Sequence, residues 1–187
     1  MKKKLAVDKN IRYVAFLRGI NVGGHAPILM ADLKRAFERL GFSDVRTLLA
    51  SGNVVFASAR ADQKGLTNEI ESGLKRAFKK DIRVILRGLD DLEMLRSAAP
   101  FKGIQVTPSI RLYVTFLSEK AKSRTISIPY ASPQGEFRIL QATSGEVFSV
   151  LDLSKGTGTP DAMNILEKEF GAEVTTRNWH TVLKAMA

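Results

Sequence analysis

Residues 18–25 combine the residue types that proteins use to hold an anion. Three glycines fall within six residues, and glycine lets the backbone take positive φ angles and approach a ligand closely. An arginine beside them could hold a phosphate or carboxylate together with backbone amides, without a metal. The candidate ligand-binding residues of this segment are Arg18, Gly19, Asn21, Gly23, Gly24 and His25. The alternative is that the glycines serve only turn geometry or contact with a second unit.

The spacing of the glycines excludes two nucleotide-binding motifs. Gly19 and Gly24 are spaced as in a phosphate-binding loop, but such a loop continues with Lys and Ser or Thr, whereas this chain continues with His25 and Ala26. The glycine pattern of dinucleotide-binding proteins does not fit either. We therefore do not expect a magnesium-dependent nucleotidase, and metal-free anion binding remains.

Two other places offer polar groups to the same ligand. Ser51 and Asn53 flank a glycine in a short turn, and Arg177 and Asn178 stand at the start of the last predicted helix. Arginine and asparagine there offer donors for a carboxylate or phosphate. The alternative is that Asn178 caps the helix while Arg177 forms a surface salt bridge. A single shared site requires the loop and Asn178 to lie within about 15 Å, on the order of ten helical rises.

The sequence places no complete catalytic or metal-binding constellation. His25 and His180 are too few for a histidine-based zinc site, and the chain has no cysteine. Ser51 lies outside a Gly-x-Ser-x-Gly elbow. His25 could act as a general base only with a partner that the sequence does not supply, and a solvated loop histidine is the alternative. We expect no metal and no cofactor, and whether the protein is an enzyme stays open.

Positive charge is concentrated in the first half of the chain. Residues 1–87 carry 18 Lys and Arg against 8 Asp and Glu, whereas residues 88–187 carry 11 of each. Such a field favours polyanions or phosphorylated ligands, so nucleic-acid binding is the second functional hypothesis. The alternative places these charges in a solvated N-terminal tail and near a helix C-terminus, where cations suit the macrodipole. Residues 52–56 lack the RNP1 pattern, so base stacking on the sheet is not favoured.

Composition indicates a globular protein, with 44% hydrophobic and 26% charged residues. We find neither an apolar run near the roughly 18 residues that a membrane helix needs nor a signal peptide. We therefore expect no membrane partner and a cytoplasmic location. The sequence does not predict the oligomeric state.

Residues 18–25, which we call the glycine segment, lie among predicted strands and helices that alternate along the chain. Apolar periodicity predicts, in chain order, a strand at 12–18, a helix at 29–40, strands at 45–50 and 54–58, a helix at 66–78 and a strand at 82–87. Gly41 is expected to end the first helix. This is the split βαβ, or ferredoxin-like, pattern, with the first and third strands central and both helices on one face.

The second half predicts another α+β unit. Its expected elements are a short helix at 89–99, a strand at 110–117, a loop at 118–135, a hairpin at 136–142 and 146–152, and two helices starting near residues 160 and 178. Thr159 is the expected N-cap of the first of these helices, and Gly171 its end. The fold class is α+β, with a ferredoxin-like unit at 1–87 packed against a smaller α+β unit at 88–187.

Five motifs in order carry a resemblance to a known family. They lie at residues 13–24, 30–33, 41–42, 51–56 and 175–179. Together they resemble the bacterial family called domain of unknown function 1697, from about residue 11 onward. The resemblance implies a ferredoxin-like unit with a second α+β unit packed on it, and no known activity. Family members often have polar or basic residues where this chain has Ala26 and Pro27, which leaves Arg18 and the amides as anion donors.

The resulting hypothesis is a cytoplasmic binding protein for a small anionic or nucleotide-like ligand. Its site is the segment 18–25, with the turn at 51–53 and the helix start at 177–179 as further walls. A nucleic-acid-binding protein that uses the basic first half is the alternative.

Overall fold

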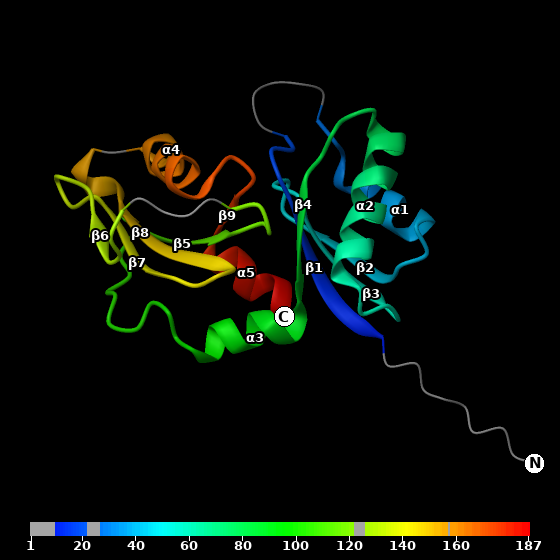
Figure 1. Ribbon diagram of the computed structural model, residues 1–187, viewed down its shortest axis with the longest axis horizontal. Coiled ribbons are helices and arrows are strands. Elements are labelled where there is room, and N and C mark those ends of the chain that lie inside the picture. The colour runs from blue at the N-terminus through cyan, green and yellow to red at the C-terminus, as the bar shows by residue number, and fades with distance from the viewer. Residues whose placement is uncertain (1–9, 22–26, 122–125, 157) are drawn as a thin grey trace, which may run out of the picture. The chain divides into compact units, whose positions relative to one another are not determined.

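The computed structural model describes residues 10–21, 27–121, 126–156 and 158–187. Contacts divide the chain into two compact units, Met1–Asp91 and Leu92–Ala187. The described residues form two antiparallel sheets and five α-helices (Figure 1). The predicted mixed α+β class is therefore confirmed.

The first unit contains the predicted alternation of strands and helices. Its elements are β1 (Ile11–Leu17), α1 (Met30–Arg39), β2 (Ser43–Leu48), β3 (Asn53–Ser58), α2 (Gln63–Phe78) and β4 (Val84–Gly88). The strand order is β2-β3-β1-β4, and every pair is antiparallel. The first and third strands are central, and both helices cover the same face of the sheet (Figure 1). This order is compatible with the predicted ferredoxin-like pattern.

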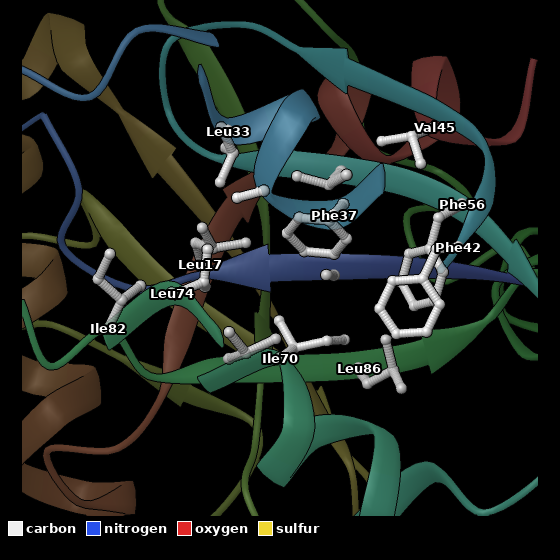
Figure 2. Packing of buried hydrophobic residues seen from close by; sticks show 14 of the residues in the cluster. Leu17, Leu33, Phe37, Phe42, Val45, Phe56, Ile70, Leu74, Ile82 and Leu86 are labelled. Atoms are coloured by element: carbon white, nitrogen blue, oxygen red, sulfur yellow. The ribbon is translucent and has the colours of Figure 1, made fainter. Parts of the chain in front are cut away.

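The core of the first unit lies between that face and the two helices. Leu33 and Phe37 project from α1, and Ile70 and Leu74 project from α2, because apolar residues three or four positions apart share one face of a helix (Figure 2). All four side chains are fully buried.

Aromatic rings fill the end of this core beyond Phe37. The ring centroid of Phe56 on β3 lies 4.5 Å from that of Phe42 and 5.4 Å from that of Phe37. Tyr13 of β1 stacks on Phe56 at 5.6 Å, and its hydroxyl donates to the carbonyl of Arg60 at 3.0 Å. Packed rings of this kind anchor the two central strands to α1.

Local signals set the ends of the helices. Gly41 follows α1 with a φ of 85°, as predicted for the residue after a helix. Asp62 caps α2, because its carboxylate accepts the Gly65 amide at 3.0 Å. Gly73 lets α2 approach the end of α1 closely, since a Cβ there would lie 2.8 Å from Leu40.

The second unit is built on a five-stranded sheet in the order β6-β7-β8-β5-β9. The helix α3 (Leu89–Ser97) begins in the first unit and ends in the second. The other elements of the second unit are β5 (Ile110–Phe116), β6 (Tyr130–Ala131), β7 (Phe137–Ala142), β8 (Glu146–Asp152), η1 (Leu153–Lys155), α4 (Thr159–Phe170), β9 (Thr175–Asn178) and α5 (Trp179–Met186). The predicted hairpin across residues 143–145 is confirmed as β7 and β8. Gly171 follows α4, as predicted.

One local prediction for the second unit was wrong, and one strand was missed. Gly158, not Thr159, is the N-cap of α4, because Thr159 already has helical geometry and no side chain caps the helix. The strand β9 was not predicted. It forms because it pairs with β5, where the hydroxyls of Thr115 and Thr176 lie 2.8 Å apart.

None of the helices in the part of the chain that the structure describes is long and apolar enough to cross a membrane. The cytoplasmic location stays a prediction.

Candidate functional site

The start of the glycine segment and the turn between β2 and β3 lie side by side in the first unit. The amide of Leu17, the last residue of β1, donates to the carbonyl of Gly52 at 2.8 Å. The next amide, that of Arg18, donates to the carbonyl of Arg83 at 2.8 Å, just before β4 begins. The residues that follow β1, the turn between β2 and β3, and the residue that precedes β4 therefore meet where β1 ends. The predicted proximity of Ser51 and Asn53 to Arg18 follows from these contacts.

Asn21 fixes the glycine segment to that turn. Its Oδ1 accepts the Ile28 amide at 2.7 Å, and its Nδ2 donates to the Ile28 carbonyl at 3.1 Å and the Ala50 carbonyl at 2.9 Å. Its φ of 59° is a left-handed conformation, which asparagine tolerates better than most residues. The Asn21 side chain thus acts as a structural clamp, so a ligand would contact the surfaces that it holds in place.

Asn53 holds the other end of the turn. Its side chain is fully buried, and its Nδ2 donates to the Leu48 carbonyl at 2.9 Å and to the Ser51 hydroxyl at 3.0 Å. Asn53 is also the first residue of β3, so the turn at residues 49–52 starts and ends earlier than the sequence indicated. Ser51 remains exposed to solvent between the two clamps.

Gly52 permits the close approach of the two segments. Its φ is 74°, and a Cβ at this position would lie 2.5 Å from Ile20 Cδ1 and 3.0 Å from Leu17 Cβ. Gly19 also has a positive φ, 65°, but a Cβ there would meet nothing within 4 Å. The glycine at 52 therefore serves packing as well as backbone geometry, whereas the glycine at 19 serves backbone geometry alone.

Arginine supplies positive charge at this end of the sheet. The Arg18 side chain is partly exposed, and its neighbour across the strands, Arg83, pairs with Glu71 of α2 at 3.1 Å. The second carboxylate oxygen of Glu71 accepts the Val84 amide at 2.9 Å, which fixes the start of β4. Arginine is suited to bind phosphate or carboxylate, because its guanidinium offers several donors in one plane.

Several other basic side chains of the first unit are paired. Exposed ion pairs join Lys34 to Glu38, Arg35 to Asp32, Arg60 to Glu69, and Lys75 to Asp81. The hydrogen bond from Lys75 and its charge hold the pKa of Asp81 below its ordinary value. Binding of nucleic acid by the basic half stays a prediction.

Three of the candidate residues cannot be placed. Gly23, Gly24 and His25 lie outside the described residues, and so do Lys2, Lys3, Lys4 and Lys9 of the N-terminal segment. The roles predicted for them stay predictions.

Arg177 and Asn178 belong to the second unit. Asn178 caps α5, because its Oδ1 accepts the His180 amide at 2.9 Å, which is the structural alternative considered for this residue. Arg177 lies in β9, where its guanidinium donates to the Thr176 carbonyl at 2.8 Å. Burial lowers the pKa of Arg177 to about 10. A site shared by Arg177, Asn178 and the glycine segment stays a prediction.

Sequence reasoning missed two exposed leucines beside the clamp. The side chain of Leu29, just before α1, is 62% exposed, and that of Leu49, in the turn, is 55% exposed. Leu49 also has a left-handed φ of 57°, which is unusual for a bulky residue. No signal in the sequence marks them, because leucines next to a strand or a helix are normally read as part of its core.

No three acidic or histidine side chains gather as a metal site would require, among the residues whose positions the structure gives. The described part of the candidate site therefore consists of arginine, amides, a serine hydroxyl and two leucines.

Residues 11–148 match the protein family described as "Protein of unknown function (DUF1697)". Among solved structures, the conserved bacterial protein SP0830 from Streptococcus pneumoniae is similar, with a TM-score of 0.72 and 21% sequence identity. The similarity covers 95% of this chain and 97% of that one. Such a likeness shows a common fold. Comparison with curated proteins gives no match.

Proposed function

We propose that this chain, which belongs to the family of proteins of unknown function DUF1697, binds a small anionic or nucleotide-like ligand. The described part of the binding site comprises Arg18, Gly19 and Ser51 as the ligand contacts, with Asn21 and the buried Asn53 as the side chains that hold these segments in place.

The clamp made by Asn21 is the observation that carries this proposal. One amide group joins the glycine segment to a turn 29 residues away, so the two segments are held together before any ligand arrives. Binding is stronger when the contact groups are ordered in advance, because less conformational entropy is lost. Two residues other than glycine, Asn21 and Leu49, have left-handed backbone in these two segments, and strained backbone is frequent at ligand-binding sites.

The chemistry of the exposed groups favours an anion. Arg18 is partly exposed at the end of β1, and the exposed hydroxyl of Ser51 lies in the turn held against that end. A guanidinium and a hydroxyl are both donors to phosphate or carboxylate oxygens. Among the described residues of the site, the small number of such donors favours a small ligand over a polymer that needs a long positive surface.

A thermal-shift screen against nucleotides and phosphorylated metabolites tests the proposal. A ligand that binds only the native state raises the unfolding temperature, by an amount that grows with its concentration over Kd. We expect Arg18→Gln to abolish the shift, because it removes the charge but keeps a side chain of similar shape. Arg39→Gln is the matched control, since Arg39 is exposed at the far end of α1. Equal shifts in both variants would refute a role for Arg18.

A further inference from the structure

Leu49 occupies a position that suits neither its backbone preference nor its apolar side chain. Its φ of 57° crowds the Cβ against the following carbonyl, a conformation that glycine and asparagine adopt more easily. Its side chain is nevertheless 55% exposed, so packing in the core does not offset this strain. A strained, exposed leucine at a turn calls for an explanation outside the stability of the unit.

The two asparagine clamps keep this strained turn in place. Asn53 holds the carbonyl of Leu48, on one side of Leu49, and Asn21 holds the carbonyl of Ala50, on the other side. The backbone on both sides of Leu49 is therefore fixed by side-chain amides. The turn presents its leucine to solvent in a defined place.

Leu29 lies next to Ile28, the residue whose backbone the Asn21 side chain holds. The Asn21 Nδ2 atom donates to the Ile28 carbonyl at 3.1 Å and the Ala50 carbonyl at 2.9 Å, so the two oxygens are separated by no more than the sum of these distances. Leu29 directly follows Ile28, and Leu49 directly precedes Ala50. Two exposed leucines thus flank one clamp, on the side of the unit where β1 ends and Arg18 follows.

We infer that the ligand carries an apolar group next to its anionic group, and that Leu49 and Leu29 contact this apolar group while Arg18 contacts the anion. This inference rests on the proposed function. An aromatic phosphate monoester has the required chemistry, because a flat apolar ring is covalently attached to the phosphate. Burial of apolar surface on the leucines would add to the affinity that charge alone supplies.

Isothermal titration and amide chemical shifts can compare two probes, inorganic phosphate and phenyl phosphate. We expect phenyl phosphate to bind about tenfold more tightly, as one partly buried leucine contact provides. Leu49→Asn should remove this advantage and leave the affinity for inorganic phosphate unchanged, because asparagine tolerates the left-handed backbone. Met94→Gln is the control. Met94 is 64% exposed on α3, and its substitution should change neither affinity.

The outcomes separate this inference from the proposed function. If both probes bind equally and Arg18→Gln weakens both, the anion site stands and the apolar contact is refuted. If neither probe binds the wild-type protein, the inference of an aromatic phosphate ligand fails, and the screen against nucleotides decides the proposed function separately. If Leu49→Asn weakens both probes equally, Leu49 acts by shaping the turn and does not contact the ligand, which also overturns the inference.

Stability gives an independent readout for the same variant. Because asparagine relieves the left-handed strain, Leu49→Asn should unfold at the same or a higher temperature than the wild-type protein. A lower unfolding temperature would identify Leu49 as a packing residue and contradict the inference.

Discussion

Asn21 holds Ile28 by both of its backbone groups, accepting the amide at 2.7 Å and donating to the carbonyl at 3.1 Å. One asparagine side chain thus bonds both backbone groups of a residue seven positions further along the chain. The same Nδ2 atom donates to the carbonyl of Ala50, so Asn21 and Ile28 are both attached to the hairpin turn.

Replacing Asn21 with alanine should therefore destabilise the first unit. The substitution removes three hydrogen bonds and puts alanine in left-handed backbone, so we expect a loss of about 2–3 kcal/mol in the free energy of unfolding. Urea denaturation measures this loss. Asn21→Gly removes the same bonds without the backbone strain and should cost less. A change below about 0.5 kcal/mol for the alanine variant, the range of ordinary surface substitutions, would contradict the clamp.

Two glycines with similar backbone angles should respond differently to alanine. Gly19→Ala meets open space, so it should cost only the left-handed strain, about 1 kcal/mol. Gly52→Ala meets the same strain and also the side chains of Ile20 and Leu17, which should add roughly 1–2 kcal/mol. Chemical denaturation of both variants measures the difference. Equal losses would show that the two segments do not pack as closely as the structure indicates.

Tyr13 should make stability depend on pH in the alkaline range. Burial, and then the charges of Asp91 and Asp62, raise the pKa of Tyr13 above its ordinary value of 10.0. The unfolded state then loses this proton first, so the stabilising contribution is complete below pH 10.0 and falls as pH rises toward the folded-state pKa.

Comparison of the wild-type protein with Tyr13→Phe isolates that contribution. The variant has no phenol to ionise, so its free energy of unfolding should fall less between pH 9 and pH 11, a window on either side of the ordinary tyrosine pKa. Parallel pH profiles for the two proteins would show that Tyr13 has the same pKa in both states.

The sequence was sufficient for the fold class because its apolar residues recur at regular intervals. Leu33 and Phe37 mark one helix, and Ile70 and Leu74 mark the other, with glycine or a cap at their ends. The strand β9 could not be found in this way. Its residues are mainly polar, and it forms only by pairing with β5, which is distant in the sequence.

The candidate site was predictable in part. The proximity of the turn near Ser51 to the end of the first strand follows from the antiparallel sheet, whereas a ligand site at the glycine segment stays a prediction. The clamp was not predictable, because Asn21 bonds to Ala50 across 29 residues and nothing local identifies that partner. The sequence predicts Leu49 within the strand at 45–50, because an apolar residue beside a strand gives no sign of left-handed backbone.

The most direct test of the proposed site is an amide chemical-shift titration of the uniformly labelled protein with adenosine monophosphate. We expect saturable shifts confined to residues 18–29 and 49–53, with little change in the amides of α1 beyond its first turn. Arg18→Gln should abolish these shifts, and Arg39→Gln should preserve them. Shifts that saturate elsewhere in the first unit, or that persist in Arg18→Gln, would contradict a ligand site built on Arg18 and the Asn21 clamp.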